Sequence, residues 1–330
     1  MDPAHRCATR DQWPVGLSSK PQSATASAST INHPNRFRTS FPMSVSQDLQ
    51  QLCQAQGTAQ ISVSKAGILM FDQRPMSTPV DVYAVQKGIV SILIGIAEAR
   101  YFLERVDAMN HILDPEWTQL TKPDEASLTV EILMNMTTGM NDQLQKQGQI
   151  GKDWFYNNVA YQKLKTALTI QTGLELNALT QAWLFEPLGI TDANWVTRAK
   201  DADGHAFSAL QTTAQSLRKI GEALLKDQLV DPYYRAALGT PSESTNPAWH
   251  LLWWNNQAPI HMRPGSDQVY PKPLLPHAPQ DLISARGAGG HHLSISPSLD
   301  LVVAQTMDPA ATRPPKHANQ QAFWDLIQQL

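Results

Sequence analysis

The chain has 330 residues, of which 42% are hydrophobic, and a formal net charge of −3. This balance argues against a chain that is disordered throughout and against a nucleic-acid partner, and the length is sufficient for a full core in one or two domains. The two cysteines, Cys7 and Cys53, do not make a disulfide framework, because Cys7 lies in the N-terminal tail.

Residues 1–42 are rich in serine, alanine, threonine, proline and basic residues and show no apolar periodicity. We interpret them as a disordered leader or an upstream extension, and their basic composition leaves a transit peptide as an alternative. The tail has no apolar segment typical of a secretory signal, so a cytoplasmic location is expected. A helical pattern begins directly after Met43.

Two early strands are predicted from the alternating pattern of residues 59–71, with a turn at Ala66 and Gly67. This hairpin contains a literal Ser-x-x-Lys, from Ser62 to Lys65. Residues three apart on a strand point to opposite faces, so Lys65 is not expected to activate Ser62. We therefore interpret Ser62 as a residue without a catalytic role.

A central helix is predicted where residues 88–97 are almost all apolar or small. A helix that is apolar all round belongs in the protein core, and this one is too short to span a bilayer. Lys87 stands at its start, where burial of an ammonium group is costly. Residues three apart on a helix share a face, so Lys87 lies one turn after Ala84. The alternative is that the Lys87 side chain extends to water.

A serine at position 84 would complete a Ser-x-x-Lys motif at the start of this helix. In such a motif the lysine takes the hydroxyl proton, and the helix N-terminus favours the developing negative charge. This chain has Ala84, which carries no nucleophilic atom. The sequence therefore keeps the position and the lysine of the motif without its nucleophile.

Helices are predicted through the middle of the chain, and strands return toward its end. The expected helices cover residues 128–136, a stretch that follows 154–161 and runs to about 172, then 176–185, 212–225 and 322–330. The expected late strands cover residues 250–254, 291–295 and 301–306, and the proline-rich segment 241–279 is expected to be irregular. Thr129 and either Thr212 or Thr213 are candidate helix caps.

This order of elements predicts an α+β fold, in which an antiparallel β-sheet flanked by helices carries an inserted, mostly helical domain. The expected division is a sheet domain from residues 43–83 and 240–330 and a helical domain from residues 84–239. A cleft between them is the expected active site.

Five motifs along the chain carry a resemblance to a known superfamily. In order they are Ala84-Val85-Gln86-Lys87, residues 132–139, Tyr156-Asn157-Asn158, residues 185–189 and Gly287-Ala288-Gly289-Gly290-His291. None is specific alone, but their order and spacing over roughly residues 59–310 resemble the serine β-lactamase and penicillin-binding-protein-like superfamily. Within it, the chain is most similar to class C-like esterases and 6-aminohexanoate-dimer hydrolases. The resemblance implies a serine β-lactamase-like fold.

The resemblance also implies roles for single residues. Ala84 occupies the position of the acyl-accepting serine, Lys87 matches the lysine that activates it, and Tyr156 matches the tyrosine that shuttles its proton. Asn158 matches the asparagine that orients lysine and substrate. The backbone amides of Ala84 and Ala288 would form the oxyanion hole. Considered alone, Tyr156 also fits a core aromatic residue and Asn158 a helix cap.

The glycine-rich turn from Gly287 to Gly290 stands where the superfamily has a Lys-Thr-Gly strand motif. By the resemblance, Gly287, Gly289 and Gly290 would lie against the substrate, because glycines allow close approach of the backbone. His291 is also placed at the substrate, at a position where this branch often has glutamine. An ordinary tight turn is the alternative.

No metal ion or other cofactor is expected. His291 and His292 are adjacent on a predicted strand, so their side chains face opposite ways and do not chelate one ion. Three other late histidines lack ligand spacing: His250, His261 and His277. Three tryptophans are expected to pack in the sheet and core, with one of them as a candidate lining of an apolar cleft: Trp249, Trp253 and Trp254.

The resulting hypothesis is a serine hydrolase or acyltransferase that acts on an ester, amide or β-lactam through an acyl-enzyme at position 84. With Ala84 in place, this chain is expected to be an inactivated variant. One alternative is a natural pseudoenzyme that binds a ligand or protein partner in the cleft, and another is an interaction module that uses residues 241–279. The expected partner is a small-molecule substrate, with no nucleic acid and no membrane, and the sequence does not indicate an oligomeric state.

Overall fold

The computed structural model describes residues 43–200, 206–311 and 320–330, and the predicted leader at residues 1–42 lies outside this part. Short 3-10 or π-helical turns are marked η. In chain order the elements are α1 (Met43–Gln56), β1 (Thr58–Lys65), β2 (Ile68–Gln73), β3 (Val80–Asp81), η1 (Tyr83–Val85), α2 (Gln86–Ala99), η2 (Met109–His111), α3 (Lys122–Ala126), α4 (Val130–Met134), α5 (Asn158–Thr172), α6 (Leu176–Thr180), η3 (Gln181–Phe185), β4 (Asn194–Lys200), β5 (Ala206–Thr212), α7 (Ala214–Leu225), α8 (Pro232–Gly239), β6 (Trp249–His250), β7 (Trp253–Asn255), β8 (His261–Arg263), β9 (Ser266–Tyr270), β10 (Ile283–Arg286), η4 (Ala288–Gly290), β11 (His292–Ser296), β12 (Leu301–Met307) and α9 (Gln320–Ile327).

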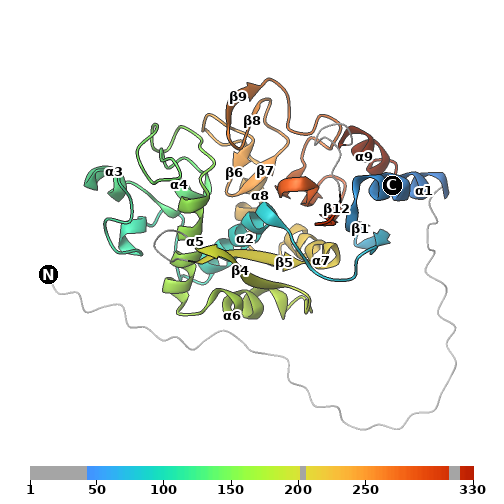
Figure 1. Cartoon of the computed structure of the whole chain (residues 1–330), viewed down its shortest axis with the longest axis horizontal. Coiled ribbons are helices and arrows are strands. Elements are labelled where there is room, and N and C mark those ends of the chain that lie inside the picture. The colour runs from blue at the N-terminus through green and yellow to red at the C-terminus, as the bar shows by residue number, and fades with distance from the viewer. Residues whose placement is uncertain (1–42, 201–205, 312–319) are drawn as a thin grey trace, which may run out of the picture. The chain divides into compact units, whose positions relative to one another are not determined.

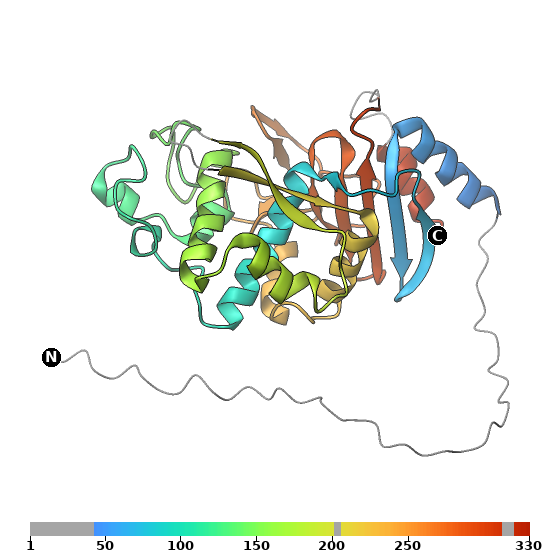
Figure 2. The same cartoon turned by 60° about the horizontal axis from the view of Figure 1, so that its bottom comes forward.

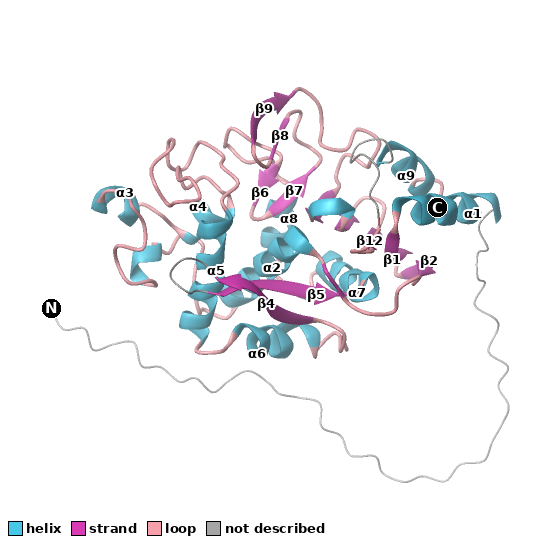
Figure 3. Ribbon diagram, in the orientation of Figure 1, coloured by secondary structure: helices cyan, strands magenta, loops and turns pink. Residues whose placement is uncertain are grey.

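A seven-stranded antiparallel sheet forms the frame of the described part, in the order β2-β1-β12-β11-β10-β7-β6. Figures 1 and 3 label β1, β6, β7 and β12 of this sheet. Strands from early and late in the chain meet within it: Val63 of β1 is opposite Val303 of β12. Figure 2 shows the blue β1 beside the red β12. The β1–β2 hairpin turns at Ala66 and Gly67, as predicted. The antiparallel sheet and its helices confirm the predicted α+β class.

Helices cover both faces of this sheet. On one face α1 and α9 pack together, and Leu49, Trp324 and Val63 of β1 belong to one buried apolar cluster. On the other face α7 packs against β1, β11 and β12. A Cβ at Gly221 would lie 2.6 Å from Cγ1 of Val302, so this glycine allows α7 to approach the sheet closely. The two apolar faces of the strands therefore form two core layers.

The central helix α2 is buried along nearly its whole length, from Gln86 to Ala97, as its all-apolar sequence predicted. A Cβ at Gly88 would lie 2.6 Å from the Cβ of Ala285 and 3.0 Å from the Trp253 ring. The glycine therefore allows the first turn of α2 to pack directly on β10 and β7. No helix in the described ranges is long and apolar enough to cross a membrane.

The structure differs from the local predictions in several places. Residues 250–254 were expected to form one strand, but β6 and β7 are two strands joined by a tight turn. Leu251 and Leu252 in this turn have φ of 48° and 70°, and their amides donate to Asn135 Oδ1 at 2.8 Å and to the Met134 carbonyl at 3.1 Å. These tertiary hydrogen bonds stabilise a left-handed backbone that leucine rarely adopts. The β4–β5 hairpin, which makes a second sheet in the order β3-β5-β4, was not predicted, and neither were α8 and β10. The segment 241–279 was expected to be irregular, but it contains the β8–β9 hairpin.

The predicted helix caps are present. Oγ1 of Thr129 accepts a hydrogen bond from Ile132 N at 3.2 Å at the start of α4, and Oγ1 of Thr213 accepts one from Ser216 N at 3.2 Å at the start of α7. Although α7 falls within the range assigned to the helical domain, it packs on the main sheet. The division of the chain into a sheet domain and a helical domain stays a prediction.

Candidate active site

The segment that leads into α2 determines where position 84 lies. Ala84 lies in the single turn η1 and is half-buried. Tyr83 before it has a φ of 52°, a strained conformation for a bulky residue and one that tends to occur at functional sites. Tyr83 N donates to Oδ1 of Asp81 at 2.8 Å, and Val82 N donates to the Leu210 carbonyl at 3.1 Å. These bonds hold the backbone at position 84 against β5.

Lys87 lies one turn further on and is buried, with 3% of its surface exposed. Its Nζ donates a hydrogen bond to Oδ1 of Asn158 at 2.8 Å. The same nitrogen lies 4.8 Å from the ring centroid of Tyr156 and 4.1 Å from that of Tyr161. The interpretation that Lys87 extends to water is therefore wrong. The structure brings together Lys87, Tyr156 and Asn158, which the sequence separates by about 70 residues.

Burial shifts the acid–base properties of these groups in opposite directions. Burial, together with the smaller effect of the positive charge of Arg198, lowers the pKa of Lys87 from 10.5 to about 7. Burial raises the pKa of the Tyr156 and Tyr161 phenols above their usual value. At neutral pH a large fraction of Lys87 is therefore an unprotonated amine, while Tyr156 is a neutral phenol. Of the two, Lys87 is the group suited to accept a proton.

Tyr156 is held by tryptophans. Its ring lies 5.7 Å from that of Trp249 in an edge-to-face arrangement and 6.0 Å from that of Trp154. Trp249 is itself fixed, because its Nε1 donates to the Met134 carbonyl at 3.0 Å and its ring contacts Trp254 at 4.9 Å. The late tryptophans were expected to pack in the core. That one of them, Trp249, also packs against the predicted proton-shuttling tyrosine was not predicted.

Two neighbouring asparagines have separate tasks at the start of α5. Asn157 is the helix cap: its Oδ1 accepts from Ala160 N at 2.8 Å, and its Nδ2 donates to the Met140 and Asn141 carbonyls at 3.2 and 2.7 Å. The alternative of Asn158 as the helix cap is therefore wrong. Because Asn157 makes the cap, the exposed Asn158 contributes its amide oxygen to Lys87 instead.

The glycine-rich turn lies next to position 84. A Cβ at Gly287 would lie 2.3 Å from the Val82 carbonyl oxygen and 3.3 Å from Ala84 N, so only glycine allows β10 to run this close to η1. Ala288 follows and is exposed, and Gly289 has a φ of 85°. The structure therefore brings the backbone around Gly287 to the amide of Ala84. The roles of Ala288, Gly289 and Gly290 toward a substrate stay predictions.

The two adjacent histidines face different surroundings. His291 is buried with its ring centroid 5.5 Å from that of Tyr83, and its Nδ1 accepts from Met307 N at 3.3 Å. His292 begins β11 and packs against Phe323 of α9 at 5.6 Å. Burial lowers the pKa of His292 to about 3, so it is neutral. Within the described residues no group of three or more His, Cys, Asp or Glu side chains is arranged to hold a metal ion.

Two cations near the site were missed by the sequence analysis. Lys165 of α5 is buried, and Arg198 of β4 forms an ion pair with Asp81 and lies 4.9 Å from the Tyr83 ring. Lys165 follows Leu164 on the apolar face of α5, and a lysine at such a core position was the available signal. Arg198 lies in the hairpin that was not predicted.

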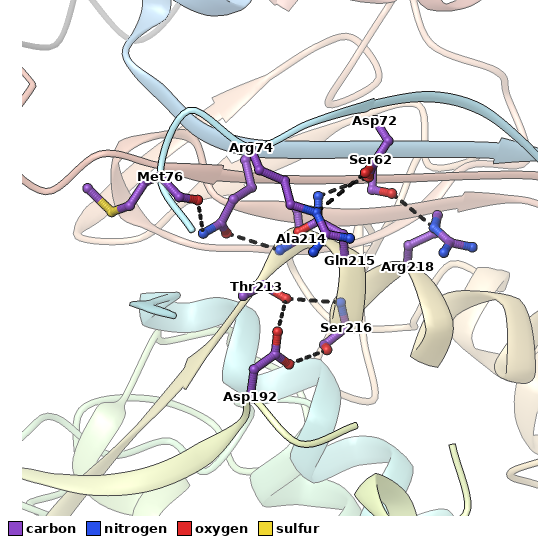
Figure 4. A network of polar contacts seen from close by, with 11 residues as sticks. Ser62, Asp72, Arg74, Met76, Asp192, Thr213, Ala214, Gln215, Ser216 and Arg218 are labelled. Carbon is purple, nitrogen blue, oxygen red and sulfur yellow. Dashed lines mark hydrogen bonds and ion pairs between the residues drawn. The ribbon is translucent and has the colours of Figure 1, made fainter. Parts of the chain in front are cut away.

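The serine of the literal Ser-x-x-Lys motif, Ser62, lies in the main sheet and not in the candidate site. Ser62 is fully buried in β1, and its Oγ accepts a hydrogen bond from Nε of Arg218 at 2.9 Å. Figure 4 shows Ser62 with Asp72 and Arg218 in a polar network that joins β1 and β2 to α7. These contacts give Ser62 a structural role.

Comparisons with known proteins identify the family and the fold. The family model described as Beta-lactamase matches residues 66–320. A β-lactamase from Mycobacterium bovis shares 16% identity with a TM-score of 0.63, covering 85% of this chain and 99% of that one. A presumed 6-aminohexanoate-dimer hydrolase from Bacillus anthracis shares 14% identity with a TM-score of 0.64, covering 85% and 81%. EstCE1, a hydrolase with promiscuous acyltransferase activity, shares 11% identity with a TM-score of 0.64, covering 86% and 98%.

At these low identities the structural likeness shows a common fold. No curated protein sequence matches the chain. The fold expected from the order of the five motifs is confirmed by these neighbours.

Proposed function

The chain belongs to the β-lactamase family, and we infer from this that its site is built for acyl transfer, with position 84 as the acyl acceptor and Lys87 as its base. One observation carries the proposal. The amine of Lys87 is buried one turn after position 84, has a pKa lowered to about 7 and is oriented by Asn158 at 2.8 Å. A base for a hydroxyl nucleophile needs this combination of position and protonation state.

The proposed reaction requires serine at position 84. Lys87 accepts the hydroxyl proton while the oxygen bonds to the carbonyl carbon of an ester, amide or β-lactam. The amides of Ala288 and of position 84 stabilise the oxyanion. The phenol of Tyr156 then donates its proton to the leaving group and recovers one from Lys87. Water or an amine attacks the acyl-enzyme by the same route in reverse and restores the free hydroxyl.

Ala84 supplies no oxygen for this step, so the chain as it stands is proposed to bind a substrate without turning it over. A second candidate function follows from the same residue: a pseudoenzyme that binds a ligand or protein partner in the former active site. The two candidate functions predict different effects of Ala84→Ser on turnover. A catalytic framework regains turnover, whereas a long-standing binding protein does not.

The test compares Ala84→Ser with the original chain on a p-nitrophenyl ester, a p-nitroanilide and a chromogenic β-lactam. We expect Ala84→Ser to release product from at least one class and the original chain to release none. The double variant Ala84→Ser/Lys87→Met is the control for background reactivity, and it should lose the gain. A folded Ala84→Ser protein that is inactive on all three classes would favour the pseudoenzyme.

A further inference from the structure

Two buried lysines approach the same tyrosine ring. Nζ of Lys87 lies 4.1 Å and Nζ of Lys165 lies 5.0 Å from the ring centroid of Tyr161. The two lysines are 3% and 4% exposed. Two ammonium groups at such close quarters in a protein interior repel each other strongly, so one of the pair gives up its proton more readily than the other.

The hydrogen-bond partners differ between the two amines. Nζ of Lys165 lies 2.6 Å from Oε1 of Gln86, 2.9 Å from the Ser208 carbonyl and 3.0 Å from the Ser208 hydroxyl. An ammonium group has three N–H donors, and these oxygens match that number. For Lys87 the described residues provide one acceptor, Oδ1 of Asn158. The charged form is therefore better solvated by protein groups at Lys165 than at Lys87.

Burial and nearby charges act on both lysines. Burial lowers the pKa of each, and the positive charge of Arg198 on β4 acts on both in the same direction, while the charge of Lys87 also lowers the pKa of Lys165. The carboxylate of Asp81 on β3 acts in the opposite sense and raises the pKa of Lys165. The phenols of Tyr156 and Tyr161 have raised pKa values, so they add no negative charge at neutral pH. Against the cost of burial, Lys165 thus has three acceptors and a nearby carboxylate, whereas Lys87 has one acceptor among the described residues.

We propose that Lys165 is a positioning residue that carries the proton of this pair, and that its charge keeps the amine of Lys87 unprotonated. The inference rests on the proposed function, because it explains how Lys87 is kept in the form that a base requires. Gln86 links the two lysines structurally, since it precedes Lys87 on α2 and accepts from Lys165 on α5. The same contact holds the first turn of α2 in place.

The test is a pH titration of the full chain labelled with lysine carrying ¹³Cε and ¹⁵Nζ, followed by NMR, with Lys87→Met used to assign the Lys87 signal. In Lys165→Met we expect the titration midpoint of Lys87 to rise by about 1 unit or more. Lys165→Arg keeps the charge and should keep the midpoint low. Lys163→Met is the matched control: Lys163 is half-buried two residues earlier on α5, on a different face, and its loss should leave the midpoint unchanged.

An unchanged Lys87 midpoint in folded Lys165→Met would overturn the proposal. If Lys165→Met does not fold, the unaltered chain decides: Lys165 must titrate at a higher pH than Lys87, and the reverse order overturns the proposal. The readout is protonation and not turnover. The outcome is therefore independent of whether Ala84→Ser proves active, and the two proposals fail separately.

Discussion

The amine of Lys87 donates a 2.8 Å hydrogen bond to the side-chain oxygen of Asn158, and this contact joins the first turn of α2 to the first residue of α5. The acceptor is a neutral amide, which orients the amine without the counter-charge that a carboxylate would supply. Desolvation therefore remains the dominant influence on Lys87 and holds its pKa at about 7. The pKa of Lys87 should therefore depend strongly on whether residue 158 is neutral or charged.

Asn158→Asp tests that balance. A carboxylate at this distance would favour the ammonium form and raise the pKa of Lys87. In the Ala84→Ser background, kcat/KM requires unprotonated Lys87, so its acid limb should move to higher pH by about 1 unit or more, with about tenfold lower kcat/KM at pH 6. Asn158→Ala is the paired variant, because it removes the acceptor without adding charge, and its acid limb should not move upward. Equal shifts in both variants would contradict the account.

Substitutions of Asn157 and Asn158 should affect stability to different extents, because Asn157 caps α5 whereas Asn158 contacts Lys87. Asn157→Ala removes a helix cap and two donations to carbonyls from a buried side chain, so we expect a loss of about 2–3 kcal/mol in the free energy of unfolding. Asn158→Ala removes no cap but leaves the buried Lys87 amine without its described acceptor, so we expect a smaller loss of about 1 kcal/mol. Urea denaturation measures both. A larger loss from Asn158→Ala than from Asn157→Ala would show that the cap is wrongly assigned.

Gly287→Ala should separate β10 from η1. Its Cβ would lie 2.3 Å from the Val82 carbonyl oxygen, so the strand must move away from the amide of Ala84. In the Ala84→Ser background we expect kcat to fall about 10²–10³-fold, the cost of losing an oxyanion donor. Gly239→Ala is the control, because its Cβ would make an ordinary contact of 3.5 Å with Ile283. Full activity of Gly287→Ala would place the oxyanion site elsewhere.

Burial of Lys87 should cost stability in a pH-dependent way. Its pKa is about 7 in the folded chain against an ordinary value of 10.5, so between these values the unfolded chain binds more protons and stability rises with pH. Lys87→Met removes this cost. We expect the variant to be more stable than the original chain at pH 6–7, by on the order of 3 kcal/mol, with the gain shrinking toward pH 10. A gain that is constant from pH 6 to 10, measured by denaturation, would mean that Lys87 does not titrate in this window.

Several helices and strands could be predicted because local sequence patterns determine them. The all-apolar stretch after Lys87 predicted a buried helix, and the alternating pattern before Ala66 and Gly67 predicted the first hairpin. The tight turn at Leu251 and Leu252 could not be predicted, since its left-handed backbone depends on hydrogen bonds to residues more than 100 positions away. Such contacts leave no local signal.

The candidate site was also predicted only in part, because some of its contacts depend on the fold. The motif order pointed to Lys87 and Asn158, and the structure places them in contact. Lys165 was not recognised, although it follows Leu164 on the apolar face of α5, because its partners cannot be read from the sequence. Only the fold brings it to Gln86 and to the same tyrosine ring as Lys87.

The central claim is that position 84 is an acyl acceptor served by Lys87, and intact-protein mass spectrometry of Ala84→Ser tests it most directly. The protein is exposed briefly to a β-lactam or ester whose acyl-enzyme hydrolyses slowly. The account predicts a mass increase of one acyl group, located by peptide mapping to the serine introduced at position 84. The original chain and Ala84→Ser/Lys87→Met should show no such increase. A folded Ala84→Ser protein that gains no acyl group from esters, amides or β-lactams would contradict the account.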